Sequence, residues 1–266
     1  MEPTRHQISV GATDALSLRV SVAALVSVQF RSPADGQRML VLERTATLRP
    51  TEGRPEIVVI AKPFGGAVQL TDPRALEQLI GDFHYDSERS RLEGDFRIQV
   101  RPAAWERIKL ICRENYDGTA KRILDASPER ELAEEFHDSL KVRIVPAQYS
   151  LRPRGMTAQE TLKKTGNVRA QGHPTVRIYY VYEAHMLDPD LIEMILANST
   201  RYSDSDLKEI ARGDAQQGGR GRANAVLALG LDELEKMYRA FPIDGPDGPV
   251  RVGEHQLDEN VSAILR

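Results

Sequence analysis

Three glutamates within five residues are the strongest candidates for chemistry in this chain of 266 residues. Glu131, Glu134 and Glu135 follow i, i+3 and i+4 spacing inside the run RELAEE (130–135), so on a helix their carboxylates share one face. Three like charges on one face repel one another, and a bound cation would compensate them. Because carboxylate oxygens are hard ligands, we expect Mg²⁺ or Mn²⁺ as the cofactor.

The sequence predicts a helix over 128–140 that would carry these acids. Ser127 suits the N-cap because its hydroxyl can accept a backbone N–H, and Pro128 suits the first helical position. Apolar residues recur at every fourth position through Phe136 and Leu140, which defines a buried face. The helix would therefore have a packing side and a separate acidic side.

A glycine turn upstream could meet the acidic face. The stretch 56–64 is rich in β-branched residues and predicts a strand, which Pro63 ends because proline has no N–H for the ladder. Gly65 and Gly66 then permit a tight backbone path next to a ligand. Asp72, which precedes a proline, is either a helix N-cap or a catalytic acid.

These two motifs together resemble the Nudix hydrolase family. The family signature ends in Arg-Glu-aliphatic-x-Glu-Glu, as residues 130–135 do, and it opens with a glycine turn like that at 63–66. Strands expected at 20–30, 38–45 and 56–62 and a late helix at 229–241 also follow the family's order. The resemblance implies a fold of the α/β (α+β) class, a Nudix-like α/β/α sandwich with a mixed sheet.

The chain departs from the family pattern in the spacing of the motif. The family has seven residues between its first acid and the Arg-Glu pair, whereas 57 residues (73–129) lie between Asp72 and Arg130 here. We therefore expect a single domain, 1–266, with a helical insertion at 73–126. Trp105 and Cys112 are most simply core residues of that insertion, and nothing in the sequence favours a nucleophilic cysteine.

The resemblance also implies roles for individual residues. The three glutamates would bind the metal, and Gly65 and Gly66 would lie beside it, Gly66 through its backbone carbonyl. Arg130 would hold a carboxylate through a fork-like salt bridge, and we expect it to act with Glu131 and Glu134 as the catalytic residues. The implied enzyme is a diphosphate (pyrophosphate) hydrolase that acts on a nucleoside diphosphate linked to another moiety.

Further charged residues could complete such a site. Cations that could approach the leaving phosphate by their location are Lys62, Arg152, Arg154, Arg220 and Arg222. A fifth acid could come from Glu183 or Glu160. His137 is expected to be a surface or capping residue.

Other elements are expected on both sides of the acidic run. Strands are predicted at 17–30, 38–45, 95–100, 141–151 and 174–186, and helices at 74–83, 103–115, 191–198, 205–213 and 229–241. The stretch 216–222 is expected to be a flexible basic loop, and 242–266 a C-terminal tail that is turn-rich over 242–250.

Composition restricts the class of protein. The net charge of −3 argues against a global nucleic-acid footprint, so nucleic acid is not an expected partner. One cysteine excludes a disulfide within the chain and a multi-cysteine zinc site. The first residues contain no apolar stretch typical of a secretory signal, and no run is long enough to span a membrane, so we expect a cytoplasmic protein without a membrane partner.

Three alternatives stay open from the sequence. The chain could be a catalytically inactive Nudix-like module that binds a nucleotide or a protein. It could bind nucleic acid through the loop 216–222 with Arg152 and Arg154. The acidic face could also be only a solvated helix surface, because glutamate is a good helix former. The substrate is not specified by the motif, and a homodimer is equally open.

Overall fold

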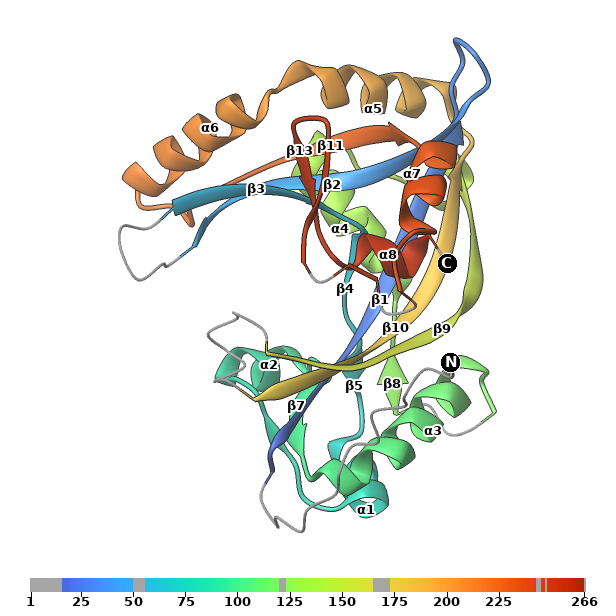
Figure 1. Ribbon diagram of the computed structural model, residues 1–266, viewed down its shortest axis with the longest axis vertical. Coiled ribbons are helices and arrows are strands. Elements are labelled where there is room, and N and C mark those ends of the chain that lie inside the picture. Colours follow the sequence, from blue (N-terminus) through green and yellow to red (C-terminus); the bar gives the residue numbers. More distant parts are fainter. Residues whose placement is uncertain are drawn as a thin grey trace. The chain divides into compact units, whose positions relative to one another are not determined.

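The chain has an α+β fold with a mixed sheet, as the sequence predicts. The computed structural model describes residues 16–49, 56–119, 123–164, 173–242, 245–246 and 248–265. Within these ranges, eleven strands join one hydrogen-bonded sheet and a further two form a small sheet, with eight α-helices around them (Figure 1). The described helices include none that is both long and apolar enough to cross a membrane.

Contacts divide the chain into two compact units. Unit 1 comprises Met1–Ala24, Ala67–Ala126 and Met156–Tyr180, and unit 2 comprises Leu25–Gly66, Ser127–Gly155 and Val181–Arg266. The expected insertion at 73–126 falls inside unit 1. This division leaves the prediction of a single domain over 1–266 open.

Unit 2 is built on antiparallel strands around β2 (Arg38–Arg49). β2 pairs with β1 (Leu18–Arg31) through a hairpin, with β3 (Glu56–Lys62), and with β11 (Arg222–Gly230). Residues 32–37 form the connection at the tip of this hairpin. β13 (His255–Leu257) joins β3 in parallel, which makes the sheet mixed.

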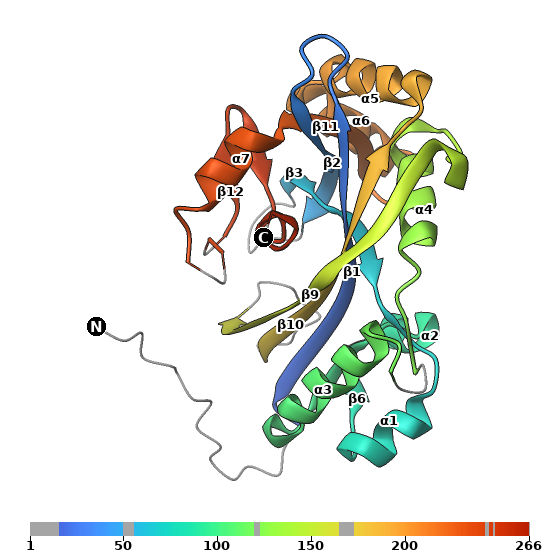
Figure 2. The same ribbon diagram turned by 90° about the vertical axis from the view of Figure 1, so that its right-hand side faces the viewer.

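Successive side chains of β2 point to opposite faces of this sheet, and the two faces pack against different helices. Ala46 and its neighbours on one face pack against α6 (Asp204–Gln216), whereas Val41 and Val226 on the other face belong to the core cluster of α4 (Pro128–Leu140). Helices α4 and α6 therefore cover opposite faces (Figure 1). In the view of Figure 2, α4 and α7 (Leu231–Tyr238) also lie on opposite sides of β1 and β2.

Helix α4 has the bounds that the sequence predicts. Its apolar face places Leu132 and Phe136, both fully buried, in a core with Ile195 of α5 (Pro189–Arg201). The start of the helix is also as expected, but Ser127 has a positive φ of 32° and its hydroxyl makes no capping hydrogen bond. The expected N-cap bond was therefore wrong.

Unit 1 contains the elements of the expected insertion. Its helices are α1 (Pro73–Ile80), α2 (Glu88–Glu93) and α3 (Trp105–Tyr116), and its short strands are β6 (His84–Tyr85) and β7 (Arg97–Val100), the latter paired with β1. Trp105 and Cys112 are buried, as predicted for core residues. Burial raises the pKa of Cys112 to about 12, so this thiol is a poor nucleophile at neutral pH.

A two-stranded clasp joins the two ends of this segment. β5 (Gln69–Leu70) pairs with β8 (Leu124–Asp125), and the N–H of Thr71 donates to the carbonyl of Ile123 at 2.9 Å. The chain thus leaves β4 (Phe64–Ala67) and returns to α4 through neighbouring backbone segments. Asp72 accepts the N–H of Ala75 at 3.0 Å and caps α1, which favours its structural reading over a catalytic one.

Several elements differ from the sequence expectation. The strand predicted at 141–151 begins only at Tyr149 and continues as β9 (Tyr149–Lys164). β9 extends through mostly polar residues because the neighbouring strand β10 (Pro174–Met186) supplies its hydrogen-bond partners. β11, which the sequence did not predict, begins at Arg222, the last residue of the expected basic loop. The C-terminal region contains β12 (Val250–Val252), β13 and the buried helix α8 (Val261–Ile264), so it is more than a turn-rich tail.

Candidate functional site

The glycine turn lies directly against the acidic face of α4. The N–H of Gly65 donates to Oε2 of Glu135 at 2.6 Å. A Cβ added at Gly66 would lie 2.0 Å from Oε2 of Glu131, so a side chain at this position would collide with the carboxylate. Gly65 has a φ of 140°, a region that other residues rarely adopt. The structure therefore brings together the two motifs that the sequence singled out, although residues 67–126 separate them.

Aromatic packing holds this arrangement. Phe64, directly before the glycines, stacks on Phe136 of α4 with ring centroids 4.9 Å apart, and both side chains are fully buried. β4 also pairs with β1, so the turn is fixed to the sheet on one side and to the helix on the other. α4 continues past Phe136 without interruption to Leu140.

Arg130 binds two of the three acids. Its Nη2 lies 2.6 Å from Oε1 of Glu131, and its Nη1 lies 3.2 Å from Oε1 of Glu134. The Glu131 side chain is 11% exposed, whereas that of Glu134 is 60% exposed. Arg130 therefore makes the carboxylate contact that the resemblance implies, and Glu134 is the acid most open to solvent.

Glu135 belongs to a different ion-pair network, which begins at Lys62. Nζ of Lys62 lies 3.2 Å from Oε1 of Glu135 and 2.7 Å from Oε2 of Glu43. Burial raises the pKa of Glu135, while Lys62 lowers it and the neighbouring Glu43 raises it further. Burial lowers the pKa of Lys62, but the two carboxylates outweigh this and raise it overall, so the ammonium stays charged.

Glu43 is a site residue that sequence reasoning missed. It is fully buried, faces Lys62 across the β2–β3 pair, and accepts from Nη2 of Arg222 at 3.1 Å. The signal for it was a carboxylate directly after the apolar run 39–42. Arg222, predicted only as a mobile phosphate contact, is instead the first residue of β11 and pairs with this buried carboxylate.

Glu183, a candidate fifth acid, lies in a separate cluster of charged side chains that includes Arg152 and Arg154. Glu183 accepts from Arg152 at 2.5 Å and contacts His185 at 2.7 Å, and Nε of Arg154 lies 3.7 Å away. Burial raises the pKa of Glu183, but the hydrogen bonds from Arg152 and His185 outweigh it and lower the pKa overall. These contacts occupy Glu183 with cations.

The structure also places Glu160 and His137. Glu160 pairs with Lys109 at 2.6 Å inside unit 1, a contact that gives this acid a structural partner. His137 is exposed on α4, as expected for a surface residue.

The acids of α4 match a hard divalent cation in the chemistry of their donor atoms. Their donors are all carboxylate oxygens, and the absence of a side chain at Gly66 leaves space that the Glu131 carboxylate occupies. As the side chains are arranged, no group of three or more His, Cys, Asp or Glu within the described ranges could hold a metal ion. Arg130 and Lys62 compensate the acids instead.

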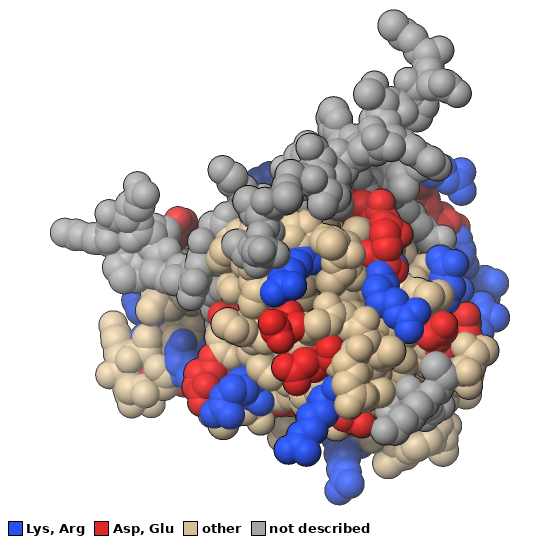
Figure 3. All heavy atoms as spheres, turned by 90° about the horizontal axis from the view of Figure 1, so that it is seen from below, with Lys and Arg blue, Asp and Glu red and all other residues tan. Residues whose placement is uncertain are grey.

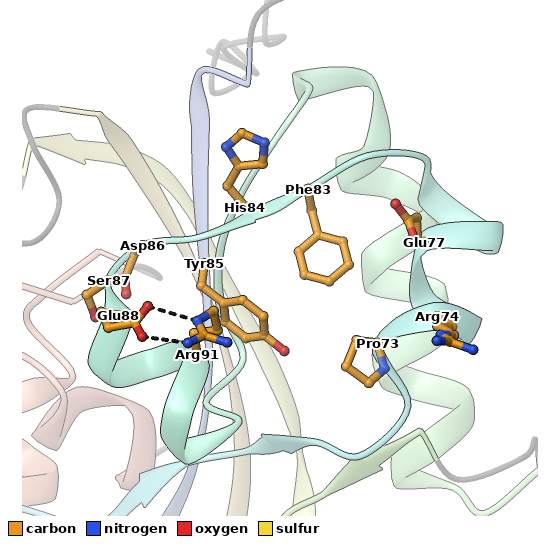
Figure 4. A pocket seen from close by; sticks show the side chains of 10 residues that line it. All are labelled: Pro73, Arg74, Glu77, Phe83, His84, Tyr85, Asp86, Ser87, Glu88 and Arg91. Atoms are coloured by element: carbon orange, nitrogen blue, oxygen red, sulfur yellow. Dashed lines mark hydrogen bonds and ion pairs between the residues drawn. The ribbon is translucent and has the colours of Figure 1, made fainter.

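Unit 1 contains a separate recess of about 570 Å³ (Figure 4). Phe83 and Tyr85 lie on one side with their rings edge to face, 5.6 Å between centroids, and Pro73 and Arg74 of α1 lie on the other. Arg91 forms an ion pair with Glu88 at the rim. Three carboxylates (Glu77, Asp86 and Glu88) and two arginines (Arg74 and Arg91) line this recess, which gives it no preference for phosphate.

The visible charges give little support to nucleic-acid binding. Figure 3 shows Lys and Arg interspersed with Asp and Glu over the described atoms of the face seen from below. Arg152 and Arg154 are engaged by Glu183, and Arg222 by Glu43. Most of the basic residues proposed for this role therefore have acidic partners.

Comparisons with known proteins leave the family open. No protein-family model matches the chain, and no curated protein matches it. Among solved structures, one similar chain comes from the "Structure of T. brucei MERS1-RNA complex", with 12% sequence identity and a TM-score of 0.25. The match covers 82% of this chain and 55% of that one, so it spans about half of the other protein. A TM-score this low carries no argument about fold or function.

Proposed function

We propose that the chain is a metal-dependent hydrolase that cleaves the diphosphate of a nucleoside diphosphate linked to another moiety. The observation that supports this most directly is the meeting of the glycine turn with the acidic helix, through Gly65 with Glu135 and Gly66 with Glu131. A solvated acidic surface would need no such contact. The Nudix resemblance supplies the reaction class, and the geometry supplies the reason to retain it.

In this proposal each site residue has a separate role. Glu131, Glu134 and Glu135 would hold Mg²⁺ or Mn²⁺, which when bound compensates the phosphate charge and favours attack by water. Arg130 orients Glu131 and Glu134 through its two ion pairs. We assign Glu134 to the attacking water as the acceptor of its proton, because it is the exposed acid of the three.

The test is a magnesium-dependent hydrolysis screen with the full chain and its Glu134→Gln variant. The substrates are nucleoside diphosphate sugars, dinucleoside polyphosphates, NAD-like dinucleotides and nucleoside triphosphates. We expect Glu134→Gln to reduce turnover by roughly 100-fold or more while the melting temperature is kept. Glu129→Gln, an exposed acid in the first turn of the same helix, is the matched control and should retain activity. Equal turnover in the Glu134 variant would remove the assignment.

A second candidate is a non-catalytic module that binds a nucleotide or a protein. The observation that favours it is that all three acids already form ion pairs, two with Arg130 and one with Lys62. It predicts that a nucleotide raises the melting temperature without product formation. Robust magnesium-dependent product release would defeat this reading.

A further inference from the structure

Lys62 occupies the position of a counter-ion beside the proposed metal site. Its Nζ lies between two carboxylates, 3.2 Å from Oε1 of Glu135 and 2.7 Å from Oε2 of Glu43. The register of β2 and β3 fixes this position, because Glu43 and Lys62 are direct cross-strand partners. The lysine is thus held by the sheet rather than by the acidic helix.

We propose that Lys62 holds Glu135 in the metal-free protein and competes with the divalent cation for this carboxylate. This inference rests on the proposed function, since it concerns the same metal site. Both oxygens of Glu135 are already engaged, Oε2 by the N–H of Gly65 and Oε1 by Lys62. A divalent cation at Glu135 would lie close to the Lys62 ammonium, and because two positive charges repel at short range, cation binding favours displacement of the ammonium from Glu135.

Glu43 gives the displaced ammonium a place to remain. It is fully buried, and its other oxygen accepts from Arg222, so it stays fixed when Glu135 turns away. Lys62 can then keep one carboxylate partner whether or not a cation is bound. Two carboxylates around one lysine are what such an exchange requires.

A purely structural role for Lys62 makes the opposite prediction for metal affinity. If Lys62 only positioned Glu135 for the cation, its removal would disorder a ligand and weaken binding. If Lys62 competes, its removal frees a ligand and removes a repelling charge, so binding becomes tighter. The direction of the change therefore separates the two roles without reference to catalysis.

The experiment measures Mn²⁺ affinity of the full chain by titration, with free Mn²⁺ followed by electron paramagnetic resonance. We expect Lys62→Met to bind Mn²⁺ about tenfold more tightly than the unmodified chain. Lys62→Arg, which keeps the charge, should stay close to the unmodified affinity. Lys208→Met on α6, on the other face of the sheet, controls for the loss of one charge and should change little. Adding Glu135→Gln to Lys62→Met should abolish the gain.

A second variant protects the test against misfolding. Lys62→Met leaves Glu43 with one partner fewer, so Lys62→Met/Glu43→Gln restores the charge balance and should show the same tighter binding. Equal or weaker Mn²⁺ binding in both variants, with measurable binding by the unmodified chain, overturns the role of Lys62 and leaves the proposed function standing. Absence of Mn²⁺ binding in every form overturns both.

Discussion

At the scale of single residues, the site depends on contacts that tolerate little change. Gly66 leaves room for Glu131 only because it lacks a side chain, and Gly65 combines a positive φ with a hydrogen bond to Glu135. Polar contacts of this kind fix carboxylates in place before any cation arrives. The positions that matter most are therefore the smallest residues as well as the acids.

The first prediction concerns Gly66→Ala. The added methyl group would lie within 2.0 Å of Oε2 of Glu131, so the carboxylate or the turn must move. We expect a loss of about 1–3 kcal/mol in the free energy of unfolding, as for other overpacked sites, and weaker Mn²⁺ binding. Gly213→Ala inside α6 meets no atom within 4 Å and should instead stabilise the protein by about 0.5–1 kcal/mol. Equal effects of the two substitutions in urea unfolding would contradict this account.

The second prediction concerns pH and Glu183. Its folded-state pKa lies below the ordinary value of 4.5, so its ion pairs stabilise the fold above that pH, and the stabilisation is lost as pH falls through the folded pKa. Glu183→Gln should cost about 1–3 kcal/mol at pH 7, because it removes charged hydrogen bonds with Arg152 and His185. The difference between the two proteins should shrink below pH 4.5. Urea unfolding at pH 7 and at lower pH values measures it, and a constant difference would speak against the ion pairs.

The acids and the glycines of the site could be predicted from residue type and spacing alone. The Lys62–Glu43 pair could not, because it depends on which residues of β2 and β3 face each other, and a shift of one residue would place Glu43 on the other face. The partners of Arg222 and Glu183 were missed for a related reason. Long charged side chains can pair with whatever the register brings near them.

At the scale of elements, α4 and β4 form one packing unit through Phe64 and Phe136. The stack lies directly beneath the turn and the acidic face, so it sets the distance between them. The Phe136 ring fills the space between helix and strand. The chemistry on one side of α4 thus depends on the apolar contact on its other side.

The third prediction tests this dependence with Phe136→Ala and Phe136→Leu. Removal of a fully buried aromatic ring should lower the free energy of unfolding by about 3–5 kcal/mol, and the freed turn should weaken Mn²⁺ binding. Leucine fills most of the space and should cost less than about 1.5 kcal/mol. If the alanine variant unfolds under the assay conditions, the leucine variant with a smaller loss of both quantities still tests the link. Unchanged Mn²⁺ affinity in a destabilised variant would argue against it.

Elements with strong periodicity were predictable and the others were not. The bounds of α4 agree with the pattern of Phe136 and Leu140 because helix periodicity and burial point the same way. β9 was missed over its polar part because β10 supplies its ladder, and polar residues can then form a strand without apolar alternation. β13 depends on the edge of β3, which no local pattern reveals.

At the scale of the whole molecule, unit 1 has a buried ion pair of its own. In unit 1, Arg19 donates to Asp86 at 2.7 Å and both side chains are buried, with Ser90 donating to the other oxygen of Asp86. Trp105, the single tryptophan of the chain, is buried in the same unit. Its fluorescence therefore reports on unit 1 and not on the site of α4.

The fourth prediction uses this probe with Asp86→Asn. Loss of the carboxylate leaves the Arg19 guanidinium buried without its counter-charge, so urea unfolding followed by Trp105 emission should show a loss of about 3–5 kcal/mol. Replacing both residues, as in Arg19→Met/Asp86→Leu, should recover most of it, because an apolar pair needs no desolvation of charge. A double variant as unstable as the single one would show that the charges themselves are needed.

The clasp of β5 and β8 has a consequence for how the site forms. A flexible loop of the length of 67–126 would cost roughly 3–4 kcal/mol of loop-closure entropy each time the glycine turn met α4. Because the β5–β8 pair joins Leu70 to Leu124, the contact between the glycine turn and α4 requires order only in the few residues between this pair and the site. The rest of the segment adds nothing to the loop-closure entropy of that contact. The segment between Thr71 and Ile123 can therefore change in length during evolution without weakening the contact between the glycine turn and α4.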